Sequence, residues 1–179
     1  MSSQAEEHED PAVEAALYAL LGRLLAAEVD AEFLAVLRSP GVAEVFERAV
    51  PACLVEFDLE DAAAEYCRLF VLPGGVPAVA GAWLPGEEPN RAAGIAGLVA
   101  NLKSELQLEL PQDLPPDHAG LLLPLLAWLT GHQADAADDF IDAALRPWLA
   151  SFARALAGRA NLPLYRAVGK LLIVCVNDW

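Results

Sequence analysis

Apolar residues recur along the chain at the three- and four-residue spacing of amphipathic helices. Near the N-terminus a leucine stripe follows Asp10-Pro11, a pair typical of a helix N-cap and first helical position. The stripe consists of Leu17, Leu20, Leu21, Leu24 and Leu25. Asp30, Asp58 and Asn90 each precede a further apolar face and are predicted to cap a helix. We find no convincing strand alternation, so the sequence predicts an all-α fold.

Proline and glycine divide this pattern into a single-domain bundle of about eight or more helices. After the hinge-like stretch "PQDLPPDH", three helical segments are expected, over residues 117–131, 134–160 and 162–177. Pro147 lies inside the second segment and should kink or break it, because proline removes a helical hydrogen bond. We expect one domain over residues 11–179, preceded by a disordered acidic tail at residues 1–10.

The helix expected after Asp58 runs into an unusual loop. Residues 71–83, "VLPGGVPAVAGAW", carry no charge and no acid, base, nucleophile or metal ligand. We call this segment the apolar loop. It could cover the core as an Ω-type loop, or it could offer backbone N–H and C=O groups to a ligand. The loop by itself leaves both interpretations open.

Charge narrows the class of partner. The 179 residues include 26 acidic and 11 basic side chains, a net charge of −15. Binding to nucleic acid needs a basic footprint, so no nucleic-acid partner is expected. A basic ligand or peptide fits better. Acidity can also serve only to keep a chain with 56% hydrophobic residues in solution.

The hydrophobic segments are too short or too interrupted to cross a membrane, which takes roughly 18 consecutive apolar residues. The N-terminus "MSSQAEEHED" has no apolar core of a secretory signal. We therefore expect a cytoplasmic protein without stable membrane insertion. Cys53, Cys67 and Cys175 are far apart and odd in number, so buried free thiols are expected rather than a disulfide framework or a zinc site.

Catalytic motifs are missing from the sequence. It contains no H-E-x-x-H, G-x-S-x-G, P-loop or G-x-G-x-x-G pattern. His8 lies in the polar tail, and His132 follows Gly131 at an expected helix end, where a cation is favoured by the dipole. The sequence thus predicts a protein that is not an enzyme, with no catalytic residue, metal or cofactor.

Three stretches together resemble the TorD/DmsD/NarJ family of maturation chaperones for molybdenum- and iron–sulfur-containing redox enzymes. They are "EYCRLFVLPGGVP", then "LPPDH" opening a leucine-rich helix that ends in "LAWL", and "LRPWLASFARALAGRANLPLYRAVGKLLIV" at the C-terminus. The resemblance implies a TorD/DmsD-like helical protein. It also implies a partner: the N-terminal, twin-arginine-type signal peptide of a molybdopterin oxidoreductase catalytic subunit, or a remnant of such an N-terminus. The chaperone would hold this peptide until cofactor insertion and assembly.

Matching the family's motifs residue by residue gives a candidate peptide site. Asp117 is its best polar contact, because a carboxylate can accept a bidentate bond from arginine. Asp117 could equally cap the following helix. For the apolar members, ordinary core packing is the alternative. The candidate peptide-binding residues are Tyr66, Leu69, Phe70, Pro77, Trp83, Asp117 and His118.

Departures from the family pattern shift the expected specificity. The loop reads "VAGAW" where the family often has an aromatic residue and a serine, and Leu122 and Pro124 stand where acids are usual. We therefore expect a groove that selects the apolar part of a signal peptide. The competing interpretation is a helical scaffold whose apolar surplus forms a homodimer without binding a signal peptide; the chaperone itself could be a monomer or a homodimer. A nucleotide-binding enzyme is the third, and no phosphate-binding motif supports it.

Overall fold

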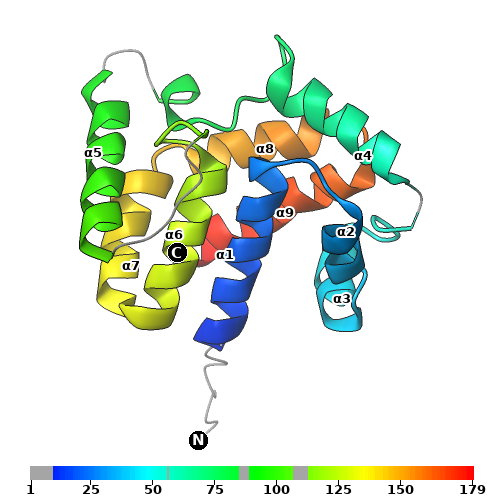
Figure 1. The fold of residues 1–179 in the computed structure, drawn as a ribbon, viewed down its shortest axis with the longest axis horizontal. Coiled ribbons are helices and arrows are strands. Elements are labelled where there is room, and N and C mark those ends of the chain that lie inside the picture. The colour runs from blue at the N-terminus through cyan, green and yellow to red at the C-terminus, as the bar shows by residue number, and fades with distance from the viewer. Residues whose placement is uncertain (1–9, 56, 85–88, 107–112) are drawn as a thin grey trace, which may run out of the picture.

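The computed structural model describes residues 10–55, 57–84, 89–106 and 113–179, and in these ranges the fold is helical, as the sequence predicts. Its one β-type pairing among the described residues is a single antiparallel bridge between Val79 and His118. Figure 1 shows the arrangement. The α-helices are α1 (Pro11–Ala26), α2 (Ala31–Leu37), α3 (Pro40–Ala49), α4 (Leu59–Tyr66), α5 (Pro89–Leu106), α6 (Ala119–His132), α7 (Ala134–Phe140), α8 (Leu149–Arg159) and α9 (Pro163–Asp178).

Local sequence signals explain most helix starts. The side chains of Asp10, Asp30 and Asp58 accept hydrogen bonds from backbone N–H groups in the first turns of α1, α2 and α4. Asp58 and Asp61 form a reciprocal capping box, which satisfies two N–H groups that a helix start leaves free. The cap predicted at Asn90 is wrong: α5 already begins at Pro89, so Asn90 lies within the helix.

Three segments have tighter or wider turns than an α-helix. Cys67–Val71 and Ile141–Leu145 are π-helical, and Ala80–Ala82 is a 3-10 turn within the apolar loop. The second π-helical segment precedes the break at Pro147 and separates α7 from α8, as predicted for this proline. The first directly follows α4 and leads into the apolar loop.

The core lies between two layers of helices. Helix α1 packs mainly against α6, and α8 packs against α9, which also contacts α3. In Figure 1, α1, α5, α6 and α7 are all roughly vertical, whereas α8 and α9 run across the view and α9 passes behind α1. Leu21, Leu24 and Leu25 of the predicted α1 stripe are completely buried.

The expectation of a tail falls on residues 1–10, of which only Asp10 is described, as the cap of α1. Within the described ranges, no helix is both long and apolar enough to cross a membrane.

Candidate functional site

The candidate residues fall into two groups, one before and one after the first turn of the apolar loop. Tyr66, Leu69 and Phe70 belong to α4 and the π-helical segment that follows it. The ring centroids of Tyr66 and Phe70 are 5.2 Å apart, and that of Phe70 is 5.7 Å from Tyr165 of α9. Tyr66 and Phe70 are partly exposed, whereas Leu69 is only 1% exposed. Leu69 therefore packs in the core, which is the alternative that the sequence left open.

The π-helical segment determines where the apolar loop begins. The N–H of Leu72 donates to the carbonyl of Cys67 over 2.8 Å, a bond across five residues. This wider turn ends with Val71 and Leu72 in solvent, 63% and 57% exposed, and Pro73 is exposed as well. Three consecutive apolar residues at the surface form the most prominent apolar feature of the loop.

Two glycines then turn the loop back onto the π-helical segment. Gly74 has a φ of 82°, which L side chains rarely adopt. A Cβ atom on Gly75 would lie 2.2 Å from the carbonyl oxygen of Leu69, so only glycine fits there. The next N–H, of Val76, donates to that same Leu69 oxygen over 2.5 Å. Backbone contact thus fixes the loop immediately after its exposed residues.

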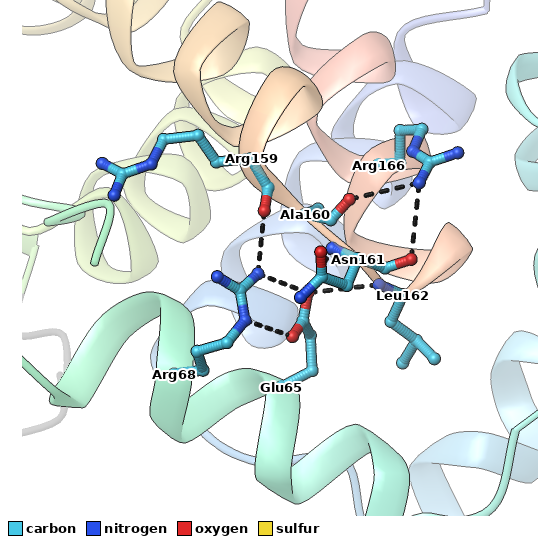
Figure 2. Close-up of polar contacts among 7 residues, drawn as sticks. All are labelled: Glu65, Arg68, Arg159, Ala160, Asn161, Leu162 and Arg166. Carbon is cyan, nitrogen blue, oxygen red and sulfur yellow. Dashed lines mark hydrogen bonds and ion pairs between the residues drawn. The ribbon is translucent and has the colours of Figure 1, made fainter. Parts of the chain in front are cut away.

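A buried carboxylate lies between α4 and the turn after α8 (Figure 2). Glu65, 7% exposed, accepts two hydrogen bonds from the Arg68 guanidinium, at 2.7 and 2.8 Å. It also accepts from the backbone N–H groups of Asn161 and Leu162, at 2.5 and 3.1 Å. Burial favours the neutral acid, but these hydrogen bonds outweigh it and hold the pKa of Glu65 below its usual value. Glu65 therefore joins α4 to the turn between α8 and α9.

Arg68 forms an ion pair with Glu65 and also contacts the end of α8. Arg68 Nη2 donates to the carbonyl of Arg159 over 2.8 Å. The Arg159 guanidinium in turn donates to the carbonyl of Gly75 over 3.0 Å and to that of Gly74. A chain of polar contacts thus runs from α4 through the end of α8 to the apolar loop.

Pro77 and Trp83 belong to the second group and contact each other. Trp83 Nε1 donates to the carbonyl of Pro77 over 2.7 Å. The Trp83 ring packs edge-on against Phe152 of α8, with centroids 6.0 Å apart. Pro77 is exposed and Trp83 is partly buried. The indole thus closes the second half of the loop against the core.

Asp117 and His118 lie directly against the apolar loop. The N–H of Ala80 donates to the carbonyl of Asp117 over 3.0 Å, and the N–H of Ala119 to that of Ala78 over 2.7 Å. Asp117 Oδ2 also accepts from the N–H of Gly81 over 2.9 Å. Both residues therefore lie beside the apolar loop at the start of α6. Asp117, however, is not the cap of that helix.

The cap of α6 is His118, whose Nδ1 accepts from the N–H of Gly120 over 3.0 Å. Because Nδ1 is an acceptor, the proton of the neutral ring is on Nε2. Burial lowers the pKa of His118, and the nearby Asp117 carboxylate opposes this only in part. A protonated ring would also lose the cap, so both effects favour neutral imidazole.

The last turn of α1 contacts both Tyr66 and the start of α6. Tyr66 donates its hydroxyl proton to the carbonyl of Leu25 over 3.4 Å, in the last turn of α1. A Cβ atom on Gly120, two residues after His118, would lie 2.8 Å from the backbone of Ala26. Tyr66 and Gly120 therefore both lie against the last turn of α1.

These contacts change which residues belong to the candidate site. Leu122, which stands where related proteins have an acid, is completely buried and packs in the core. Arg159 and Glu65, which organise the loop, were not among the candidates. Glu65 could have been found as the acid three residues before Arg68, on the same helical face. No local signal connects Arg159 with Gly74 and Gly75, which lie 84 to 85 residues away.

Across the described ranges, no group of three or more His, Cys, Asp or Glu residues is arranged to hold a metal ion. The three cysteines are free thiols; Cys53 and Cys175 are buried, as predicted, whereas Cys67 is partly exposed.

Comparisons with known proteins agree with this architecture. A solved structure described as a redox enzyme maturation protein, from Archaeoglobus fulgidus, has the same fold, with a TM-score of 0.58 at 20% sequence identity. The similarity covers 89% of this chain and 93% of that one. No curated protein sequence matches the chain. A family profile described as the nitrate reductase delta subunit matches residues 6–154, which include both groups of candidate residues. The chain therefore belongs to the nitrate reductase delta subunit family, whose NarJ- and TorD-type members are redox enzyme maturation chaperones and not catalysts.

Proposed function

We propose that this chaperone acts in the cytoplasm and binds the N-terminal, twin-arginine-type signal peptide of a molybdopterin oxidoreductase catalytic subunit, which we call the client. It holds the peptide until the cofactor is inserted and the subunit is assembled. The observation that carries the proposal is the apolar loop. Its residues Val71, Leu72 and Pro73 are exposed while the turn after them is fixed by backbone contact.

The chemistry of a signal peptide fits this surface. Such a peptide has a basic head and an apolar body. Exposed valine, leucine and proline side chains offer the apolar body area to bury. Asp117, partly exposed beside the loop, uses Oδ2 for Gly81, while Oδ1 makes no hydrogen bond to any described residue. A carboxylate oxygen can accept a hydrogen bond from a guanidinium. The net charge of −15 favours approach of a basic peptide.

The first test is calorimetric titration with a signal peptide and two variants of it. Replacing the leucines of its apolar segment by serine should weaken binding more than replacing its arginines by lysine. Burying one leucine contributes about 1.5–3 kcal/mol, whereas an exposed ion pair contributes about 0–1 kcal/mol. A larger loss from the arginine change would contradict the apolar selection. If no peptide binds and size-exclusion chromatography shows a dimer, the scaffold interpretation replaces this proposal.

The same titration with Asp117 variants separates its charge from its contact with the loop. Asn can still accept from the Gly81 N–H, so Asp117→Asn removes the charge and keeps the loop bond. If Asp117 binds a guanidinium that is partly desolvated in the complex, this variant should lose about 1–3 kcal/mol of binding free energy, with an unchanged thermal melt. Binding by wild type should also weaken more with rising salt than binding by the variant. Equal affinities and equal salt slopes would leave Asp117 with only a structural role.

A further inference from the structure

We propose that Arg159 is a positioning residue for the client site. Its side chain fixes the conformation of the apolar loop, and through the loop it sets the affinity for the client. This inference rests on the proposed function, since it assigns a role to a residue that lies on another helix and outside the candidate site. Arg159 itself is the last residue of α8.

The contact is two-pronged and directed at the loop backbone. Nη1 of Arg159 donates to the carbonyl of Gly75 over 3.0 Å, and Nη2 donates to the carbonyl of Gly74. A guanidinium presents its N–H groups in a planar fork, so one side chain can hold two adjacent carbonyls. These two residues immediately follow the exposed Val71, Leu72 and Pro73. Arg159 therefore restrains the turn that orients them.

The base of the contact is itself held on both sides. The carbonyl of Arg159 accepts from Arg68 Nη2, and Arg68 is paired with the buried Glu65 (Figure 2). Glu65 also accepts from the N–H groups of Asn161 and Leu162, just after α8. The helix before the loop and the turn after α8 are thus fixed to each other. Because the backbone at Arg159 is held in place, its side chain can restrain the loop and does not move along with it.

The partners of Arg159 differ from those of other arginines in this chain. Arg23, Arg48 and Arg146 each pair with a nearby carboxylate. Arg159 pairs with no carboxylate among the described residues, although acids outnumber bases 26 to 11 in this chain. Its exposed guanidinium donates to the two loop carbonyls instead.

Restraint of the loop translates into affinity. A loop that samples many conformations is competent to bind for only part of the time, and the apparent dissociation constant rises by the inverse of that fraction. Ordering it upon binding also costs conformational entropy. The Arg159 contact removes both costs before the client arrives.

The experiment compares Arg159→Ala and Arg159→Lys with Arg154→Ala. Arg154 is exposed on the same helix and makes no side-chain hydrogen bond to the described residues, so it is the matched control. The readouts are the dissociation constant for a twin-arginine signal peptide, amide hydrogen exchange and a thermal melt. Arg159→Ala should weaken binding about fivefold to tenfold, the effect of losing roughly one hydrogen bond of typical net strength at the protein surface. Arg159→Lys should restore part of the affinity, and Arg154→Ala should match wild type.

Hydrogen exchange reports the loop directly. In Arg159→Ala, the amides of Gly75 and Val76 should exchange faster, while those of α9 keep their wild-type rates. Wild-type exchange at both amides, or faster exchange with an unchanged dissociation constant, would overturn the inference. If Arg159→Ala melts too low to be studied, Arg159→Lys decides it, with an expected twofold to threefold loss of affinity and wild-type affinity as the contrary result.

Failure of the proposed function is distinguishable from failure of this inference. If wild type binds no signal peptide, the proposed function fails and the role of Arg159 in affinity fails with it. The exchange rates then still decide whether Arg159 orders the loop. If wild type binds and Arg159→Ala binds equally well, the proposed function stands and only the positioning role is overturned.

Discussion

Helices α1 and α6 approach each other through small residues, whereas the apolar loop is held in place by polar side chains. A Cβ atom on Gly22 of α1 would lie 2.5 Å from Pro124 of α6, and one on Gly120 would lie 2.8 Å from Ala26. In the loop, by contrast, backbone carbonyls accept hydrogen bonds from the side chains of Arg159 and Trp83, and a backbone N–H donates to the carboxylate of Asp117. Both regions bring backbone segments close together, but for different physical reasons.

This difference separates what stabilises the fold from what shapes the site. The helix pair depends on complementary volume, and such packing responds strongly to single added atoms. The loop depends on contacts worth about 0.5–3 kcal/mol each, at the surface, where water can replace them in part. Changes to the loop should therefore alter binding well before they alter folding.

The largest expected effect comes from adding one methyl group between the helices. Gly120→Ala should lower the free energy of unfolding by about 2–3 kcal/mol, because the new Cβ would collide with the backbone of Ala26 rather than with a flexible side chain. Gly131→Ala in the same helix is the control, since no atom lies within 4 Å of its added Cβ. Urea denaturation measures both. Similar stabilities of the two variants would contradict close packing of α1 on α6.

An intermediate loss of stability is expected from a substitution at Glu65, the buried carboxylate of the polar network beside the loop. Glu65→Gln keeps the shape of the side chain but replaces one acceptor oxygen by an NH₂ group. That group would face N–H donors of Arg68 or of the α8–α9 turn, and a donor cannot hydrogen-bond to a donor. Unfolding free energy at pH 7 should fall by about 1–2 kcal/mol. The exposed Glu60→Gln in the same helix should change little.

The lowered pKa of Glu65 predicts the direction in which stability changes with pH. Its lowered pKa means that its contribution is present above its usual value of 4.5 and is lost as pH falls through the native pKa. Glu65→Gln should therefore lose less stability than wild type on acidification below pH 4.5. A steeper acid loss in the variant would contradict the assigned shift.

The smallest effect is expected at His118, where the loop meets α6. Its pKa is lowered in the native state, so the unfolded chain binds the proton first as pH falls below 6.5. Stability should decline from pH 6.5 downward by at most about 1.4 kcal/mol per pH unit, the limit for one proton. Asn is a good N-cap, so His118→Asn should keep α6 and flatten this slope. Parallel slopes for variant and wild type, from melts at pH 5 to 7.5, would show that His118 is not the titrating group.

Prediction from the sequence succeeded where the determinant is local. Asp10, Asp30 and Asp58 cap helices because a carboxylate two or three residues ahead of an N–H is a short-range arrangement. Pro147 interrupts its segment for an equally local reason. These signals gave the helical class and most of the boundaries.

The contacts that shape the candidate site were not accessible in this way. Aspartate is a common helix cap, but the carboxylate of Asp117 accepts a hydrogen bond from Gly81, 36 residues away in the sequence. His118 caps α6 instead. The π-helical turn after α4 depends on how Leu69 and Gly75 meet in three dimensions. Arg159 reaches the loop only because Glu65 and Arg68 fix the end of α8 beside it. Contacts between residues far apart in the sequence produce no periodic pattern, so a single sequence does not predict them.

The pairing of α1 with α6 also has a consequence for synthesis of the chain. Helix α1 ends at Ala26, and its main partner does not begin until Ala119. At translation rates of about 5–20 residues per second, the leucine face of α1 waits on the order of 5–20 seconds after emerging before α6 has been made. Helices α8 and α9, by contrast, are consecutive and can pair as soon as both leave the ribosome. The leucine face of α1 therefore stays without its main partner during most of the synthesis of the chain.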